Sequence, residues 1–182
     1  MFAPATRVAG PTGSRVVLGI DPGLTRCGYA AVGVAGAREE LRAMGVMTTP
    51  RDADLADRLA TLHAEFAALL ADIRPDAVAV ERIFVQHNTA TAVAVAQASG
   101  VVLALAAATG CEVATYTPSQ VKSSLTGWGA ADKSHVQRMV QRRFALAELP
   151  EPADAADAVA IALCHVAAAP LAARVAAAGS RQ

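Results

Sequence analysis

The sequence predicts one α/β domain in which a mixed, five-stranded β-sheet is flanked by helices. Three apolar segments that look like strands follow one another near the beginning, which indicates an antiparallel start to the sheet. Helical and strand-like segments then alternate, and a strand that follows a helix usually pairs in parallel with a strand already in the sheet. The chain of 182 residues shows no internal repeat and no linker, so one domain is expected.

The predicted strands are short apolar segments bounded by turn-forming residues. The first is a β-branched run that ends at Asp21, directly before Pro22 and Gly23. The region around Gly36 separates the second and third segments and favours a hairpin loop. In chain order, the predicted strands are residues 16–20, 28–34, 41–48, 77–80 and 113–116.

The predicted helices either carry apolar residues at helical spacing or follow residues that start helices. In residues 54–73, leucines and one phenylalanine recur every three or four positions, and the pattern ends before Pro75. Pro118 precedes another helical segment, which is a common arrangement at a helix start. The predicted helices are residues 54–73, 88–109, 119–125, 132–144 and 154–169.

Both ends of the chain are expected to lie outside the domain, which should span residues 15–169. Residues 1–14 contain Gly and Pro and lack a continuous apolar stretch, so a flexible tail is expected rather than a secretory signal. Residues 170–182 are rich in Ala and fit either a helical extension or a frayed tail. Residues 83–111 lack Asp, Glu, Lys and Arg, but their polar side chains and many alanines favour a buried helix or a subunit contact over a membrane span.

The balance of charge excludes a uniformly basic surface. Sixteen Lys and Arg residues match sixteen Asp and Glu residues, so any DNA contact must depend on a local basic patch. Residues 116–144 contain such a patch, formed by Lys122, Lys133, Arg138, Arg142 and Arg143. Trp128 lies in a Gly-rich loop within this segment and fits either an inward-packed residue or a DNA contact.

The cysteines indicate a reducing environment. The chain has three, and none lies at Cys-x-x-Cys spacing, which argues against a disulfide framework and against a zinc site. We therefore expect a cytoplasmic protein.

Two acidic residues are predicted to lie at one edge of the sheet. Asp21 follows the first strand and Glu81 follows the fourth. If these strands are parallel neighbours, both carboxylates face the crevice where open α/β sheets bind ligands. Taken alone, Asp21 also fits a turn residue that accepts hydrogen bonds from backbone amides. Glu81 comes directly after four apolar residues and needs a partner or a metal ion, and the adjacent Arg82 should point to the opposite face.

A second acidic pair opens the last predicted helix. Asp154 and Asp157 are three residues apart, so their side chains lie on one face of the helix. Helix capping and the helix dipole favour the same residues at this position, so the pair alone has a purely structural explanation. Together with Asp21 and Glu81, however, the pair offers the carboxylate oxygens that hard divalent cations require and that paired-metal hydrolysis of phosphodiesters uses.

Five ordered motifs give the chain a resemblance to a known family. They are residues 19–23 followed by Gly28 and Tyr29, then residues 79–84, 120–122, 132–137 and 153–158. In order and spacing, from about residue 15 to residue 166, they resemble the RuvC family of Holliday junction resolvases. The resemblance implies an RNase H-like fold, a homodimer, and symmetric nicking of two strands of a four-way DNA junction during recombination and DNA repair.

The same resemblance implies roles for individual residues. Asp21, Glu81, Asp154 and Asp157 match metal-binding catalytic acids, which implies two Mg²⁺ ions in each site, with Mn²⁺ as a substitute. Phe84 matches an aromatic residue that stacks on bases at the junction centre, although its pattern alone also fits a core aromatic. Lys122 and Lys133 match lysines that in the family lie near the scissile phosphate, where a positive charge offsets developing negative charge. Each of them also fits an ordinary solvated lysine.

The remaining expectations concern the products and the partners. We expect in-line hydrolysis that leaves a 5′-phosphate and a 3′-hydroxyl. The resemblance also implies partnership with a RuvA–RuvB branch-migration complex.

Two other functions fit parts of the pattern. A strand leading to Asp and Gly is also typical of the phosphate loop in sugar kinases and actin-like ATPases, but those proteins need two lobes to enclose ATP and this chain supplies one. ATP binding in calorimetry would distinguish that class. A non-catalytic junction-binding protein would keep the fold without the chemistry, and the presence of all four acids argues against it.

Overall fold

A five-stranded sheet forms the centre of the structure, a computed structural model that describes residues 14–82, 89–130 and 132–179. In spatial order the strands are β3 (Arg38–Thr48), β2 (Arg26–Ala35), β1 (Arg15–Asp21), β4 (Ala77–Glu81) and β5 (Glu112–Tyr116). The β1–β2 and β2–β3 pairs are antiparallel, whereas β4 is parallel to both β1 and β5. The predicted mixed sheet, started by antiparallel strands and extended by parallel ones, is confirmed.

Strand β1 lies in the middle of the sheet and is buried on both faces. Residues 16–20 are all buried. Leu18 and Ile20 belong to the apolar cluster on one face, and Val17 belongs to the cluster on the other, because alternate side chains of a strand point in opposite directions. Burial on both faces explains why this segment is an uninterrupted apolar run.

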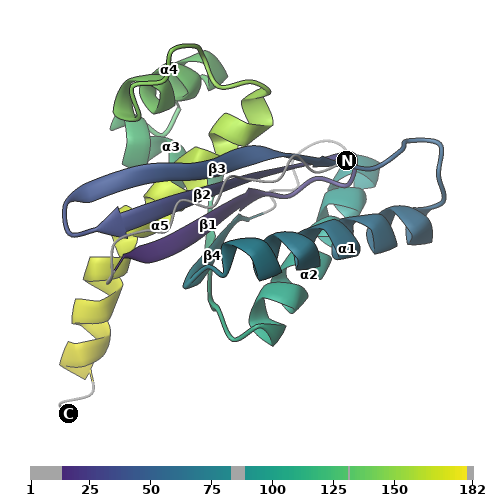
Figure 1. Ribbon diagram of the computed structural model, residues 1–182, viewed down its shortest axis with the longest axis horizontal. Coiled ribbons are helices and arrows are strands. Elements are labelled where there is room, and N and C mark those ends of the chain that lie inside the picture. The colour runs from purple at the N-terminus through teal and green to yellow at the C-terminus, as the bar shows by residue number, and fades with distance from the viewer. Residues whose placement is uncertain (1–13, 83–88, 131, 180–182) are drawn as a thin grey trace.

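Helices cover both faces of the sheet, as Figure 1 shows. One face carries α1 (Leu55–Ile73) and α2 (Thr89–Ala108), and the other carries α3 (Pro118–Thr126), α4 (Lys133–Arg143) and α5 (Ala153–Gly179). Phe66 of α1 and Val102 of α2 lie in the first apolar cluster, and Val136 of α4 and Ile161 of α5 lie in the second. In the described part of the chain, no helix is long and apolar enough to cross a membrane.

The last helix is longer than residues 154–169. It continues through Pro170 to Gly179, so residues 170–179 are helical. Alanine has the highest helix propensity, and the alanines of this segment help to offset the proline. Figure 1 shows the C-terminal turns of α5 extending beyond the edge of the sheet.

Helix α5 lies unusually close to strands β1 and β2. A Cβ atom added to Gly19 would lie 2.1 Å from the backbone oxygen of Ala158, and one added to Gly28 would lie 2.1 Å from the backbone oxygen of Asp154. Ala162 lies on the same face of α5, and its backbone nitrogen would be 2.6 Å from the added atom on Gly19. The missing side chains therefore allow the helix backbone to rest directly on the sheet, and this contact fixes where α5 begins relative to the end of β1.

Substitution of Gly19 tests this contact. Gly19→Ala is expected to lower the free energy of unfolding by about 1–3 kcal/mol, because the added methyl group forces two backbones apart. Urea denaturation of both proteins measures the difference. The matched control is Gly100→Ala on α2, where the added atom meets nothing within 4 Å and should stabilise the helix by roughly 0.5–1 kcal/mol. Wild-type stability in Gly19→Ala would contradict the close approach.

Candidate active site

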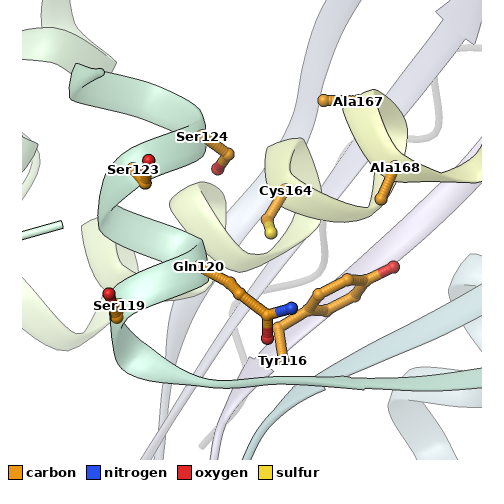
Figure 2. Close-up of a pocket in the computed structure, with 8 residues that line it drawn as sticks. All are labelled: Tyr116, Ser119, Gln120, Ser123, Ser124, Cys164, Ala167 and Ala168. Atoms are coloured by element: carbon orange, nitrogen blue, oxygen red, sulfur yellow. The ribbon is translucent and has the colours of Figure 1, made fainter. Parts of the chain in front are cut away.

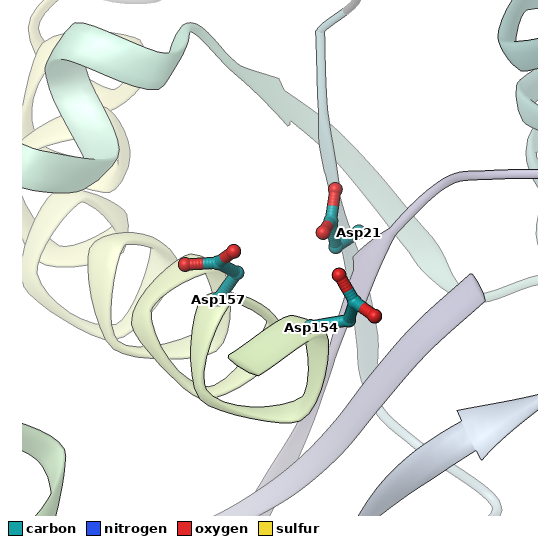
Figure 3. A group of neighbouring side chains, drawn as sticks. All are labelled: Asp21, Asp154 and Asp157. Carbon is teal, nitrogen blue, oxygen red and sulfur yellow. The ribbon is translucent and has the colours of Figure 1, made fainter. Parts of the chain in front are cut away.

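Three aspartates from two distant parts of the chain converge at one edge of the sheet. Asp21, Asp154 and Asp157 each offer one carboxylate oxygen, and these three atoms all lie within 4.8 Å of one another. Figure 3 shows Asp21 on its strand facing the two aspartates of the helix. All three side chains are half-buried. Asp21 and the helical pair, separated by more than a hundred residues, thus form one acidic group.

The local structure explains why these acids meet. Asp21 is the last residue of β1, and Pro22 cannot donate a backbone hydrogen bond to continue the ladder. Asp154 lies in the first turn of α5, where the helix dipole favours a negative charge. Because α5 rests on Gly19 and Gly28, its first turn lies beside the end of β1. Because α5 begins at Ala153, Asp154 lies in the first turn and not at the N-cap, so the helix dipole favours it there while it also belongs to the acidic group.

Glu81 lies next to this group at the end of β4. Ile20 of β1 pairs with Val80 of β4, so the two strands end side by side. Burial raises the pKa of Glu81 above its usual value, and the charge of Asp157 raises it further. Glu81 is nevertheless not one of the three residues whose oxygens lie within 4.8 Å of one another. Glu81 therefore flanks the acidic group. Its charge raises the pKa of Asp21, and the charge of Asp157 raises the pKa of Glu81.

Arg82 does not supply the counter-charge for Glu81. Its guanidinium donates a hydrogen bond to the hydroxyl of Thr115 on β5, at 3.1 Å. The expectation that adjacent strand residues point apart is consistent with this contact.

Burial and the neighbouring acids raise the pKa values of Asp21 and Glu81. Burial raises the pKa of Asp21 to about 7, and the charges of Glu81, Asp157 and Asp154 contribute to the rise. The positive charge of Lys133 opposes it. A carboxyl group in this situation gains from a bound cation, because the cation favours the ionised form that burial and like charges disfavour.

Lys133, at the start of α4, contacts the group directly. Its ammonium nitrogen lies 3.0 Å from a carboxylate oxygen of Asp157. Partial burial lowers the pKa of Lys133, but the hydrogen bond to Asp157 and the nearby charges of Asp21 and Asp154 outweigh it, so the pKa is raised overall. Lys122 of α3 is also near, since its charge opposes the rise in the pKa of Glu81. Both lysines singled out from the sequence therefore lie beside the acids.

Arg26 is a residue of this site that sequence reasoning missed. It opens β2, and its Nε atom donates to a carboxylate oxygen of Asp154 at 2.6 Å. Arg26 and Gly28 are two residues apart on one strand and therefore face the same side. Gly28 belongs to the first motif and faces α5, so strand alternation could have placed Arg26 on the same face, although it could not have identified Asp154 as the partner.

The other predicted DNA-binding residues lie in different surroundings. Arg138 and Arg142 are exposed on α4. Arg143 forms two hydrogen bonds with the carboxylate of Glu39 on β3, at 2.6 and 2.7 Å, and so attaches α4 to the sheet. Phe84 lies outside the described residues.

A pocket of about 470 Å³ is located elsewhere, between α3 and α5. As Figure 2 shows, Ser119, Gln120, Ser123 and Ser124 line one side and Cys164 the other. Of the predicted site residues that the structure describes, none lines this pocket. The acids instead lie at the carboxyl ends of β1 and β4 and at the start of α5.

The arrangement of charges suits a particular chemistry. Three clustered carboxylates with a fourth beside them provide oxygen ligands for a hard divalent cation. Lys133 and Arg26 add positive charge at the rim of the group. Carboxylates and cations together are what hydrolysis of a phosphodiester requires, because the reaction needs both an activated water and stabilisation of negative charge.

The chain is similar to known proteins over most of its length. The family model described as crossover junction endodeoxyribonuclease RuvC matches residues 17–165. The RuvC of Leifsonia xyli is 54% identical over 153 residues, which are 82% of this chain and 72% of that protein. The RuvC of Salinispora arenicola is 54% identical over 151 residues, which are 82% of this chain and 86% of that protein.

A solved structure is similar over the same region. It is Thermus thermophilus RuvC in complex with a Holliday junction substrate, with a TM-score of 0.81 and 40% sequence identity. The match covers 87% of this chain and 96% of that one. The RNase H-like fold expected from the motifs is confirmed. The matched region includes all four predicted acids, and the chain belongs to the family of crossover junction endodeoxyribonuclease RuvC.

Proposed function

We propose that this protein is an endodeoxyribonuclease that resolves Holliday junctions, with its active site at the edge of the sheet where β1 meets α5. The observation that carries the proposal is the convergence of Asp21, Asp154 and Asp157 beside Glu81 in a member of this family. A relative is known in complex with a Holliday junction substrate, which supports the same substrate here.

The donor set fits magnesium. The candidate ligands are carboxylate oxygens, which Mg²⁺ and Mn²⁺ prefer, and no thiol or imidazole belongs to the group found among the described residues. We assign Asp21, Asp154 and Asp157 as ligands, with Glu81 as the fourth acid of a site for two ions. When bound, such ions supply Lewis-acid stabilisation of the charge that develops on the phosphate during hydrolysis.

The remaining residues act on the DNA strand. Lys133 lies 3.0 Å from Asp157, so its ammonium group is placed to contact a phosphate brought to the acids. Lys122 adds a second positive charge on the side of Glu81. In this proposal the two lysines hold the phosphate while the acids orient the attacking water, and hydrolysis leaves a 5′-phosphate and a 3′-hydroxyl.

A four-way junction also requires an assembly. Two strands must be cut symmetrically, and a homodimer with two-fold symmetry would present one active site to each strand. We propose this dimer, together with base stacking by Phe84 at the junction centre and partnership with a RuvA–RuvB complex.

Removal of one carboxylate tests the site. Asp21→Asn is expected to slow the nicking of a synthetic four-way junction in Mg²⁺ by roughly 10²–10³-fold, because it removes a ligand of the cation that stabilises the negative charge developing on the phosphate. The control is Asp72→Asn, which removes an exposed acid on α1 and should leave the rate unchanged. Equal nicking by wild type and Asp21→Asn would overturn the assignment.

The raised pKa of Asp21 predicts how the metal-free protein responds to pH. Its folded pKa of about 7 exceeds the unfolded value of 3.8, so the folded state binds more protons between these values and loses stability as the pH rises through them. In EDTA near pH 8, Asp21→Asn should therefore raise the free energy of unfolding by about 1–3 kcal/mol.

The same comparison near pH 4 provides the control. There the carboxyl group is largely protonated in the folded protein, so the gain from Asp21→Asn should disappear. Urea denaturation at the two pH values measures both differences, and added Mg²⁺ should stabilise wild type more than the variant. A variant that is less stable than wild type at both pH values would contradict the prediction.

A further inference from the structure

Trp128 is a large aromatic residue that the fold leaves in solvent. Its relative exposure is 63%, higher than that of any other large apolar residue noted as exposed in the described chain. It lies in the loop between α3 and α4, and the sequence alone left open whether it packs inward. The structure answers that point, because an inward-packed indole would be buried.

The backbone around Trp128 has a defined shape. Gly127 ends α3 in the left-handed conformation, with φ of 74°, and its N–H donates to the carbonyl oxygen of Ser123. The hydroxyl of Thr126 accepts a hydrogen bond from the N–H of Trp128 at 3.1 Å, and its single proton is shared between the carbonyl oxygens of Lys122 and Trp128, at 2.8 and 2.9 Å. Gly129 lies against the hydroxyl of Ser119, where an added Cβ would be 2.6 Å away. These contacts hold the backbone while the indole remains exposed.

The loop leads directly to the active site. Five residues after Trp128, Lys133 contacts Asp157 at 3.0 Å. Five residues of extended chain span at most about 18 Å, and a DNA strand advances about 3.4 Å per nucleotide. Trp128 and Lys133 are therefore no farther apart than about five nucleotides of a single strand, so a strand whose phosphate lies at Lys133 is long enough to bring a base to Trp128.

The surroundings of Trp128 suit a nucleobase better than a protein surface. Its neighbours in the loop are Gly127, Gly129 and Ala130, so it stands as a single flat ring. The other large apolar residues noted as exposed lie on other segments: Leu55 and Val93 on α1 and α2, and Leu149 between α4 and α5. A protein interface would need a contiguous apolar patch, whereas a single exposed aromatic ring is a common site for base stacking.

We propose that Trp128 is a binding residue for DNA, on which a base of the strand near the cleavage site stacks. The inference rests on the proposed function, since it requires a DNA strand at the acids. The loop then contributes to junction affinity through the face of the indole, independently of the acids and lysines. Ordered backbone around the ring reduces the entropy lost when the base binds.

The composition of the chain makes the test direct. Trp128 is the single tryptophan, so the intrinsic fluorescence of the full-length protein reports on this side chain alone. Titration of wild type with a synthetic four-way junction, with Ca²⁺ in place of Mg²⁺, should quench the tryptophan emission and protect it from acrylamide. Trp128→Ala should bind the junction roughly 5- to 100-fold more weakly in a gel-shift assay, and Trp128→Phe, which keeps a flat ring, should recover most of that loss.

A matched control and a stability measurement separate binding from folding. Leu149→Ala removes another exposed apolar side chain and should leave junction binding unchanged. Circular dichroism should show Trp128→Ala unfolding at the same urea concentration as wild type, because the indole is exposed. Junction binding with unchanged emission, or equally tight binding by Trp128→Ala, would overturn the inference alone and would favour a protein contact. Failure of wild type to bind the junction would overturn the proposed function and this inference with it.

Discussion

The rest of this structure depends on one constraint: acidic side chains of like charge lie close together where β1 ends and α5 begins. Three carboxylates place oxygens within 4.8 Å of one another, and Glu81 raises the negative potential further. In the absence of bound cations, this arrangement opposes folding, because burial and the neighbouring acids destabilise the ionised forms of Asp21 and Glu81. Stability must therefore come from elsewhere in the fold, and the acids must be held on rigid elements.

Two features of the structure meet this requirement. The first is packing: α5 lies directly on β1 and β2, and the buried clusters on both faces of the sheet hold these elements in register. The second is electrostatic, since Lys133 and Arg26 each form an ion pair with one acid of α5. Neither ion pair is deeply buried, so solvent screens both of them. The two cations therefore lessen the repulsion among the acids without cancelling it. The site thus remains negative enough to attract a divalent cation.

Much of the fold followed from local patterns in the sequence. Burial on both faces made β1 and β4 continuous apolar runs, and their parallel pairing placed Asp21 and Glu81 at the same edge. The contact between Arg26 and Asp154 could not be predicted in that way, because it joins residues 128 positions apart and depends on how closely a helix approaches a strand. The pairing of Arg143 with Glu39 was not predictable for the same reason, because the two residues are 104 positions apart. Nor does any local pattern in the sequence indicate that Trp128 is exposed.

Gly19 and Gly28 carry a consequence for how the determinants of such a site are recognised. Mutational surveys usually shorten side chains and assign a role to each residue whose truncation lowers activity. Neither glycine has a side chain to shorten, yet both decide where Asp154 lies, because any added atom would collide with the backbone of α5. The space that they leave empty is thus as much a part of the candidate active site as the carboxylates, and only substitutions that add atoms can reveal it.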